Sequence, residues 1–210
     1  MLILYQRSVK NSYYEKIASS TVRIDEIPFE IPNSWTWIRL GAIIQVVSGV
    51  SYDKQDVRTR GIRIIRGGNI ENLKIKLLHD DVYLPQNYLD EEKLIKKGDV
   101  VIVASTGSKI AIGRAGFANE NYENTQIGAF LRIVRPIDLC LSHYIQLLFS
   151  SDYYRDHIRN LVHGNTINNI KNEYITDLLV PIPPVEEQKS IAQCCKELFL
   201  SLQMIEKSLS

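Results

Sequence analysis

Residues 96–116, KKGDVVIVASTGSKIAIGRAG, decide the fold of this chain. The run Val100–Val103 consists entirely of β-branched residues, a Lys-Gly-Asp turn precedes it, and a Ser-Thr-Gly turn follows it. A short apolar run between two such turns predicts a β-strand. The remainder of the stretch continues in the same style, with Gly113 and Gly116 as breaks, and predicts a second strand.

Three further apolar runs with glycine or proline breaks flank this stretch: AIIQVVSGV at 42–50, GIRIIRGGNI at 61–70 and IGAFLRIVRP at 127–136. In the second of these runs, strict alternation places Ile62, Ile64 and Arg66 on one side of a strand. Arg63 and Ile65 fall on the opposite side. Several short strands parted by glycine-containing turns predict a curled β core between Gly41 and Val134.

Farther along the chain the apolar period changes. Apolar residues between positions 141 and 162 recur three to five apart, which indicates helices. In the last segment the steps are 4, 3, 4, 3 and 4, as in the seam of a coiled coil. The members of this seam are Ile191, Cys195, Leu198, Leu202, Ile205 and Leu209.

The sequence before this seam has the marks of a helix start. Pro183 and Pro184 precede it, and Glu186 and Glu187 suit the positive end of a helix dipole. We therefore predict a helix of about 25 residues, roughly 38 Å long at 1.5 Å per residue. It could fold back on the body or pair with another helix. The regular spacing and the terminal position favour pairing, although three heptads alone are marginally stable.

These patterns predict an α+β fold in three parts. A lead-in segment covers residues 1–27, a mostly-β domain with small helices covers 28–183, and a long C-terminal α-helix of coiled-coil type covers 184–210. Prolines near the start of the second part favour an extended arm, and we expect Trp35 and Trp37 to anchor that arm to the body.

The composition is that of an ordinary globular chain. Its 210 residues are 45% hydrophobic and 23% charged, with a formal net charge of +1. No stretch approaches 18 uninterrupted apolar residues, so a membrane span is not expected. The apolar run after Met1 is too short for a signal peptide, and three cysteines, two of them adjacent, do not suggest a disulfide framework. We therefore expect a cytoplasmic protein.

The net charge conceals a segregated distribution. Residues 39–76 hold eight Lys and Arg against three acids, residues 77–92 hold five acids and no Lys or Arg, and residues 93–117 hold five bases against one acid. Two basic blocks could converge on one face, although a mixed solvated surface explains the same pattern.

Motifs of common enzymes are missing from the sequence. It contains no phosphate-binding or dinucleotide-binding glycine motif, no serine nucleophile elbow and no paired cysteine or histidine metal motif. A loose acidic pattern of Mg²⁺ nucleases occurs twice, as Asp80 with Glu91-Glu92-Lys93 and as Asp177 with Glu187-Gln188-Lys189. Two matches in a chain of this length show how readily that pattern arises by chance.

Six segments, taken in order, resemble a known family. They are EIPNSWTWIRLG at 30–41, GIRIIRGGNI at 61–70, KKGDVVIVASTGSKIAIGRAG at 96–116, NTQIGAFLRIVRP at 124–136, HGNTINNI at 163–170 and LLVPIPPVEEQKSIA at 178–192. The chain resembles the DNA-specificity (S) subunit of type I restriction-modification systems over about residues 28–205. It looks like one half of such a subunit, with one target recognition domain and one spacer helix. A natural half subunit, a fragment of a broken gene and a shortened chain are all open.

The resemblance implies a function and partners. S subunits are not enzymes: each recognition domain reads one half of a split target in double-stranded DNA, and the spacer helices dock methyltransferase (M) subunits. No cofactor is implied for this chain, because S-adenosylmethionine belongs to the M subunit, and ATP and Mg²⁺ belong to the restriction (R) subunit. The single spacer helix further implies a homodimer, or pairing with another half S subunit, through the seam.

A base-reading surface needs hydrogen-bonding groups for base edges and cations for phosphates. The predicted DNA contacts are Tyr52, Lys54, Arg63, Arg66, Asn69, Thr106, Ser108, Lys109 and Arg114. Gly164, Asn165, Thr166 and Asn168 match a family motif, and we interpret them as structural. Two alternatives stand beside this reading: a stand-alone Mg²⁺-dependent nuclease, and a decoy or regulatory half subunit that binds the M subunit without reading DNA.

Overall fold

The computed structural model describes residues 5–7, 13–17, 20–24, 27–162 and 168–209. The chain divides into two compact units. The larger unit is Ile43–Leu178, and the smaller unit combines Met1–Ala42 with Leu179–Ser210. These boundaries differ from the three consecutive parts predicted above, because segments from both ends of the chain pair with each other in the smaller unit.

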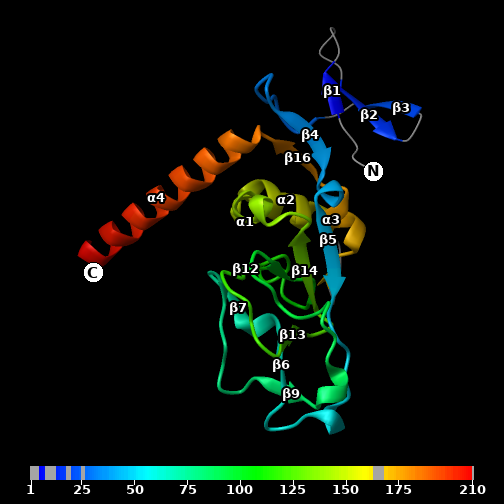
Figure 1. Cartoon of the computed structure of the whole chain (residues 1–210), viewed down its shortest axis with the longest axis vertical. Helices are drawn as coiled ribbons and strands as arrows, with labels where there is room; N and C mark the ends of the chain where they lie inside the picture. The colour runs from blue at the N-terminus through cyan, green and yellow to red at the C-terminus, as the bar shows by residue number, and fades with distance from the viewer. Residues whose placement is uncertain (1–4, 8–12, 18–19, 25–26, 163–167, 210) are drawn as a thin grey trace. The chain divides into compact units, whose positions relative to one another are not determined.

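A six-stranded sheet forms the centre of the larger unit (Figure 1). Its order is β5 (Ile44–Ser48), β14 (Leu131–Pro136), β10 (Val100–Val103), β12 (Ala115–Phe117), β8 (Leu73–Ile75) and β7 (Ile70–Glu71). β10 is the strand predicted from its β-branched run, and all four of its residues are buried. The antiparallel strands β14 and β12 flank it, so it lies inside the sheet.

The second strand predicted within residues 96–116 is shorter than expected. β12 begins only at Ala115, because the preceding residues fold into turns closed by backbone hydrogen bonds. The amide of Ile112 donates to the carbonyl of Ser108 at 3.1 Å, and the amide of Arg114 donates to the carbonyl of Ala111 at 3.0 Å. A loop therefore projects between β10 and β12.

The larger unit also holds a three-stranded sheet, in the order β13 (Thr125–Ile127), β6 (Ile62–Ile65) and β9 (Val82–Leu84). β6 confirms the predicted alternation. Ile62 and Ile64 pack in one apolar cluster with Val50 and Leu84, whereas Ile65 belongs to the other cluster, which contains residues of β10 and β14. Both sides of β6 therefore contact apolar residues, and its register is fixed by burial.

Small helices complete the larger unit: α1 (Ser142–Ser150), α2 (Asp152–Leu161) and α3 (Asn172–Thr176). The first two confirm the helices predicted between residues 141 and 162. Ser151 caps α2, since its hydroxyl accepts a hydrogen bond from the amide of Tyr154 at 3.3 Å. The two-residue strands β11 (Ser105–Thr106) and β15 (Asn168–Asn169) pair antiparallel. Single 3₁₀ turns also occur along the chain: η1 (Leu40–Ala42), η2 (Lys54–Asp56), η3 (Gly67–Asn69), η4 (Gln86–Tyr88) and η5 (Leu139–Leu141).

In the smaller unit, β4 (Thr36–Arg39) pairs antiparallel with β16 (Leu179–Ile182), and Trp37 lies opposite Pro181. Trp37 is fully buried and meets the ring of Phe29 edge-on, with centroids 5.0 Å apart. This agrees with the predicted anchoring role of that indole. Because β4 pairs with β16, the extended arm lies in the same unit as the C-terminal segment.

The segment predicted as a lead-in contains strands that the sequence did not suggest. β1 (Tyr5–Arg7), β2 (Tyr13–Ile17) and β3 (Ser20–Ile24) form an antiparallel sheet in that order. β1 and β2 mix polar and aromatic side chains without alternation, and only β3 alternates, with Val22 and Ile24 beside Thr21 and Arg23, over too short a stretch to predict a sheet.

The C-terminal helix α4 (Val185–Leu209) has the predicted length of 25 residues. Its start is fixed by the side-chain amide of Gln188, which donates to the carbonyl of Pro183 at 2.8 Å. The coiled-coil character of α4 stays a prediction. Across the described residues, no helix combines the length and apolar character needed to cross a membrane.

Candidate nucleic-acid interface

Two arginines from distant parts of the chain meet at η3 in the larger unit. Arg66 directly precedes η3, and Arg114 directly precedes β12 and donates from Nη2 to the carbonyl of Gly67 at 3.3 Å. Arg66 donates from Nη2 to the carbonyl of Asp80 at 3.0 Å and lies 3.6 Å from the Asp80 carboxylate. The structure therefore brings two of the predicted DNA contacts together, although 48 positions separate them in the sequence.

The guanidinium groups of this pair are open to an outside ligand only in part. The Nε atoms of Arg66 and Arg114 are buried and out of its reach, whereas the side chain of Arg66 as a whole is 42% exposed. The Arg66–Asp80 ion pair is exposed on both sides, so it contributes little to stability and can exchange for another anion. Two partly engaged guanidinium groups side by side suit phosphate oxygens or the acceptors of guanine.

The loop between β10 and β12 carries three more of the predicted contacts: Thr106, Ser108 and Lys109. The hydroxyl oxygen of Thr106 accepts from the amide of Ser108, and that of Ser108 accepts from the amide of Ala111, both at 3.2 Å. These hydroxyls thus shape the loop. Lys109 is exposed at the tip.

Arg155 on α2 belongs to this loop in space, and sequence analysis did not single it out. It donates from Nη1 to the carbonyl of Ile112 at 2.8 Å and from Nη2 to the carbonyl of Ile110 at 3.0 Å. Burial lowers the pKa of Arg155, and the positive charges of Arg159 and Arg114 add to that lowering. Arg114 and Arg155 are thus close enough to repel each other. An arginine on the polar side of a helix is common, so the sequence gave no sign that Arg155 contacts this loop.

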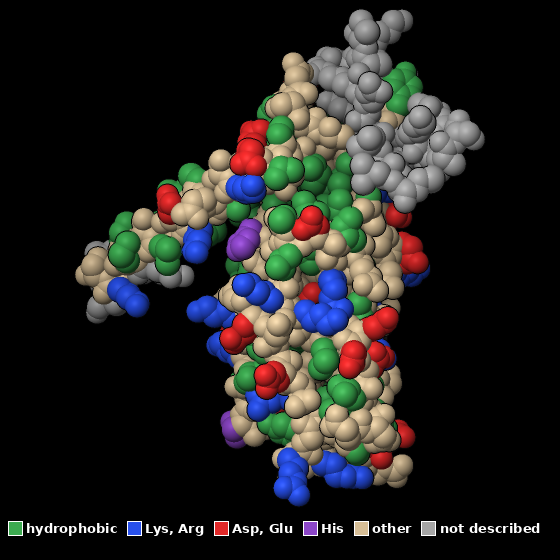
Figure 2. All heavy atoms as spheres, viewed as in Figure 1, with side chains coloured by type: hydrophobic (Ala, Val, Ile, Leu, Met, Phe, Trp, Pro, Cys, Tyr) green, Lys and Arg blue, Asp and Glu red, His purple; other side chains and the backbone are tan. Residues whose placement is uncertain are grey.

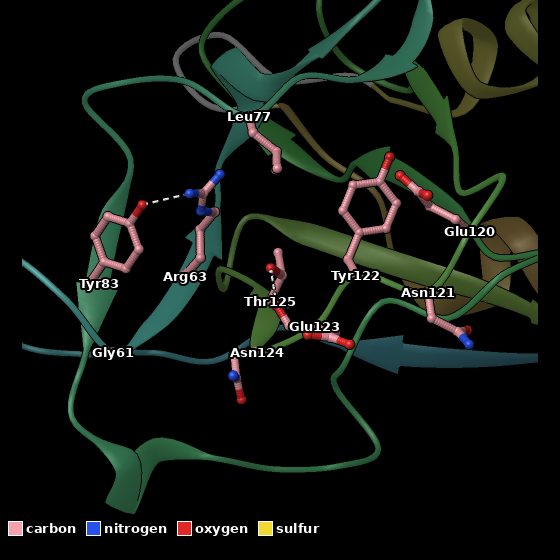
Figure 3. A pocket seen from close by; sticks show the side chains of 10 residues that line it. All are labelled: Gly61, Arg63, Leu77, Tyr83, Glu120, Asn121, Tyr122, Glu123, Asn124 and Thr125. Atoms are coloured by element: carbon pink, nitrogen blue, oxygen red, sulfur yellow. Dashed lines mark hydrogen bonds between the residues drawn. The ribbon is translucent and has the colours of Figure 1, made fainter.

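Arg63 is held in the wall of a pocket of about 440 Å³ (Figure 3). Its Nη2 donates to the Tyr83 hydroxyl at 2.6 Å, its guanidinium carbon lies 5.3 Å from the centre of that ring, and its Nη1 is 3.5 Å from the buried Asp81 carboxylate. The side chain is one quarter exposed. Arg63 is therefore a donor held in place by Tyr83 and Asp81 in the pocket wall.

The rest of the pocket wall is polar and partly acidic. Figure 3 shows Tyr122 across the space from Arg63, with Leu77 between them at one edge. The lining residues that complete it are Gly61, Glu120, Asn121, Glu123, Asn124 and Thr125. Acidic side chains disfavour phosphate but can accept a hydrogen bond from a base amino group.

Tyr52 and Lys54 lie elsewhere in the larger unit. Tyr52 is half-buried and packs against the apolar cluster of Ile62, Ile64 and Leu84. Lys54 is exposed on η2, in the segment that follows β5 and lies at the end of the larger unit opposite α1 and α2 (Figure 1). The structure gives Tyr52 a packing role and does not bring Lys54 to the Arg66–Arg114 pair.

Asn69 requires a correction. Its side chain is buried, its Nδ2 donates to Asp81 Oδ1 at 2.6 Å and to the carbonyl of Lys76 at 2.8 Å, and its Oδ1 accepts from the amide of Arg66 at 2.8 Å. Both amide hydrogens are therefore used inside the protein, which leaves none for a base. The structure gives Asn69 a structural role in place of the predicted DNA contact.

Basic side chains gather in two places on the face drawn in Figure 2. One band crosses the middle of the larger unit and a second group lies at its lower end, with acidic side chains between them. Three acids of the acidic block have internal partners: Asp80 and Asp81 as above, and Asp90 with Lys93 at 2.9 Å. Of these three, only Asp81 is buried, so it alone is held in the interior of the fold.

Within the described part of the chain, no group of three His, Cys, Asp or Glu side chains could hold a metal ion. The acidic patterns typical of Mg²⁺ nucleases thus find no cluster there. Of the motif read as structural, Asn168 belongs to β15, whereas Gly164, Asn165 and Thr166 lie outside the described residues.

The predicted seam of α4 is open along its second half. Leu198, Leu202 and Ile205 are each more than half exposed, Ile191 and Cys195 are half-buried, and the side chain of Leu209 lies outside the described residues. At 100° per residue, Leu200 and Met204 fall on the opposite side of the helix, and both are exposed as well. α4 therefore exposes apolar side chains on both sides, and Lys196 and Lys207 share the side of Leu200 and Met204.

Comparisons with known proteins agree on one family. The model of the type I restriction modification DNA specificity domain matches residues 32–209. The specificity subunit of the type I restriction enzyme EcoKI from Escherichia coli K12 is 33% identical over 168 residues, which cover 78% of this chain and 36% of that subunit. The StySPI specificity subunit from Salmonella potsdam is 32% identical over the same shares of each chain. The chain thus spans little more than a third of these relatives.

Solved structures show the same fold. The crystal structure of the HsdS subunit from Thermoanaerobacter tengcongensis superposes with a TM-score of 0.63 at 18% identity, over 87% of this chain and 42% of that one. A chain from a study of complex assembly in a type I R-M system gives a TM-score of 0.65 at 19% identity, over 86% and 42%.

Proposed function

Because the chain belongs to the family of type I restriction modification DNA specificity domains, we propose that it is a sequence-specific DNA-binding module that reads one half of a two-part target. The family match over residues 32–209 carries this proposal. The module has no catalytic role of its own, and its contribution is to hold other subunits at a chosen DNA sequence.

The Arg66–Arg114 pair and the loop between β10 and β12 support a DNA-facing role. The side chain of Arg66 is exposed, its exposed ion pair with Asp80 can exchange for another anion, and a bidentate arginine–guanine contact is worth about 1–3 kcal/mol of discrimination. Lys109 and Arg155 extend the positive charge along the loop. The position of Lys54 at the other end of the larger unit suits a flanking phosphate instead.

Binding of the whole chain to duplex DNA tests this proposal. Sites are first selected from a pool of random duplexes, and affinity for the selected site is then measured by fluorescence anisotropy at several salt concentrations. Arg66→Gln and Arg114→Gln should each weaken binding. A lost phosphate contact lowers the salt slope by about 1 for every sequence, whereas a lost base contact relaxes one position of the selected site.

Lys189→Gln is the matched control, because it also removes one exposed charge but lies on α4, where it pairs with Glu186. It should leave affinity and salt slope unchanged. Failure to select any duplex sequence would refute DNA recognition by this chain, and would favour a decoy that occupies the M subunit without reading DNA.

We also propose the partners of α4. Its seam would pair with the spacer helix of a second copy, antiparallel, so that two recognition units face the two halves of a target. The face of Leu200 and Met204 would then remain open for an M subunit, which would supply S-adenosylmethionine, while an R subunit would supply ATP-driven cleavage. Cytoplasm suits this assembly, because Cys140, Cys194 and Cys195 are free thiols.

Light scattering tests the pairing. The wild-type chain should have twice the monomer mass at micromolar concentration, and the double variant Leu198→Glu, Leu202→Glu should be monomeric because charges cannot be buried in the seam. Met204→Glu is the control on the opposite face: it should keep the dimer mass and weaken capture of the M subunit. A monomeric wild type at high micromolar concentration would refute pairing through the seam.

A further inference from the structure

The loop between β10 and β12 presents a large apolar side chain to solvent at its tip. Ile110 is 81% exposed, more than any other large hydrophobic residue in the described part of the chain. Burying such a side chain ordinarily stabilises a fold through the hydrophobic effect. Ile110 does not contribute this stabilisation, although Ile112, two residues farther along, is buried in the same loop.

The loop that holds Ile110 is fixed by hydrogen bonds on both sides of it. Before the tip, Thr106 and Ser108 close two turns with their side-chain oxygens. After the tip, the amide of Gly113 donates to the carbonyl of Val103 at 2.8 Å. The guanidinium of Arg155 then binds the carbonyl of Ile110 itself. A preorganised loop of this kind loses little conformational entropy when it binds a partner.

Positive charge surrounds the exposed side chain. Lys109 adjoins it in the chain, Arg155 binds its carbonyl, and Arg114 lies close enough to Arg155 to affect its pKa. An apolar protein surface would have to desolvate these cations without pairing them. Duplex DNA offers both features at once, because phosphates line its grooves and each thymine carries an apolar methyl group in the major groove.

We propose that Ile110 reads a thymine by packing against its 5-methyl group in the major groove, while Lys109 contacts the neighbouring backbone. This inference rests on the proposed function, because it presumes that the larger unit binds duplex DNA. It makes Ile110 a specificity-determining residue and Arg155 a positioning residue that holds the loop.

Replacing thymine by deoxyuridine removes that methyl group and leaves every hydrogen-bonding group in place. The selected duplex is therefore synthesised with each thymine replaced in turn, and affinity is measured for the full chain. At one position of the half-site the wild type should lose about fourfold in affinity, which corresponds to about 0.8 kcal/mol for one buried methyl group. Ile110→Ala should bind the thymine and uracil duplexes equally at that position.

Ile137→Ala is the matched control, since Ile137 is also largely exposed in the larger unit but follows β14 and lies outside the loop. It should keep the fourfold difference. Substitution of an exposed side chain should change stability by no more than about 0.5 kcal/mol, which thermal denaturation of both variants verifies.

The outcomes separate this inference from the proposed function. If no duplex is selected at all, DNA recognition itself fails. If the chain selects a site but shows no uracil penalty, or if Ile110→Ala keeps every penalty of the wild type, the reading of thymine by Ile110 is overturned. Equal weakening on thymine and uracil duplexes, together with reduced DNA bending, would identify Ile110 as a wedge between base pairs and would also overturn it.

Discussion

Replacement of Asn69 by alanine tests whether this residue supports the fold, as the structure indicates, or contacts DNA, as the sequence suggested. The side chain joins three parts of the larger unit: the amide of Arg66 before η3, the carbonyl of Lys76 after β8, and the carboxylate of Asp81 before β9. Alanine removes all three hydrogen bonds and leaves a buried carboxylate short of one donor.

The expected loss follows from the kind of each bond. The bonds to Arg66 and Lys76 join neutral groups and are worth about 1 kcal/mol each, and the bond to the Asp81 carboxylate is worth about 1.5–3 kcal/mol. The sum is about 4 kcal/mol, a large fraction of the roughly 5–15 kcal/mol that stabilises a typical domain. For a chain of this size it corresponds to a fall in Tm of about 8–16 °C.

Urea denaturation followed by circular dichroism measures this change, and an unchanged m-value would indicate that the same surface is exposed on unfolding. Asn119→Ala, at an exposed position of the same unit, is the control and should stay within about 0.5 kcal/mol of the wild type. A loss below about 1 kcal/mol for Asn69→Ala, combined with weaker DNA binding, would show that the structural assignment is mistaken and that Asn69 does contact DNA.

Three further predictions concern the same unit. Arg155→Gln should speed amide hydrogen exchange at Ala111 and Ile112, because the loop loses its two bonds from Arg155, whereas Arg159→Gln should not; equal exchange in both variants would contradict this. Gly49→Ala should lower the free energy of unfolding by about 3 kcal/mol or more, because a Cβ there would lie 2.1 Å from the carbonyl oxygen of Gly128. Gly68→Ala, where a Cβ would have no heavy atom within 4 Å, should be nearly neutral in the same urea denaturation. Burial raises the pKa of Tyr153 to about 12, above the value of about 10 in the unfolded chain. The contribution of this residue to stability should therefore be present below pH 10 and lost as the pH rises through about 12. Absorbance at 295 nm during alkaline titration measures this ionisation, and ordinary titration of all tyrosines would refute the prediction.

Short patterns of apolar residues in the sequence predicted several strands and helices correctly. The β-branched run of β10, the alternation of β6 and the helical period of α1, α2 and α4 all correspond to observed elements. In β6, α1 and α2 a period of 2 or 3.6 matches a face that packs, whereas β10 is a continuous buried run and the seam of α4 is exposed along its second half. Most strands of the lead-in lack such a period, and what the structure gives for them is their pairing with neighbouring strands.

Side-chain roles were harder to predict because they depend on long-range contacts. Asn69 follows a basic strand and two glycines, a typical place for an exposed hydrogen-bonding residue, yet Asp81 and Lys76 enclose it. Arg155 lies on a helix with no distinguishing pattern, yet it holds a loop more than 40 positions earlier. The order of residues shows neither that Asn69 is buried among distant residues nor that Arg155 contacts a distant loop.

The charge distribution shows how local and long-range effects combine. Sequence blocks suggested two basic regions separated by an acidic one, but the acidic block is tied into the fold: Asp81 is buried against Asn69 and Arg63, and Asp80 pairs with Arg66. The positive charge available to a partner therefore comes from side chains on or beside the loop between β10 and β12, above all Lys109 and Arg114. Because these residues frame the rigid loop that exposes Ile110, charge and apolar contact converge on one short segment. A chain with a net charge near zero can thus gather positive charge on one short segment, even though many of its acids and bases pair with one another.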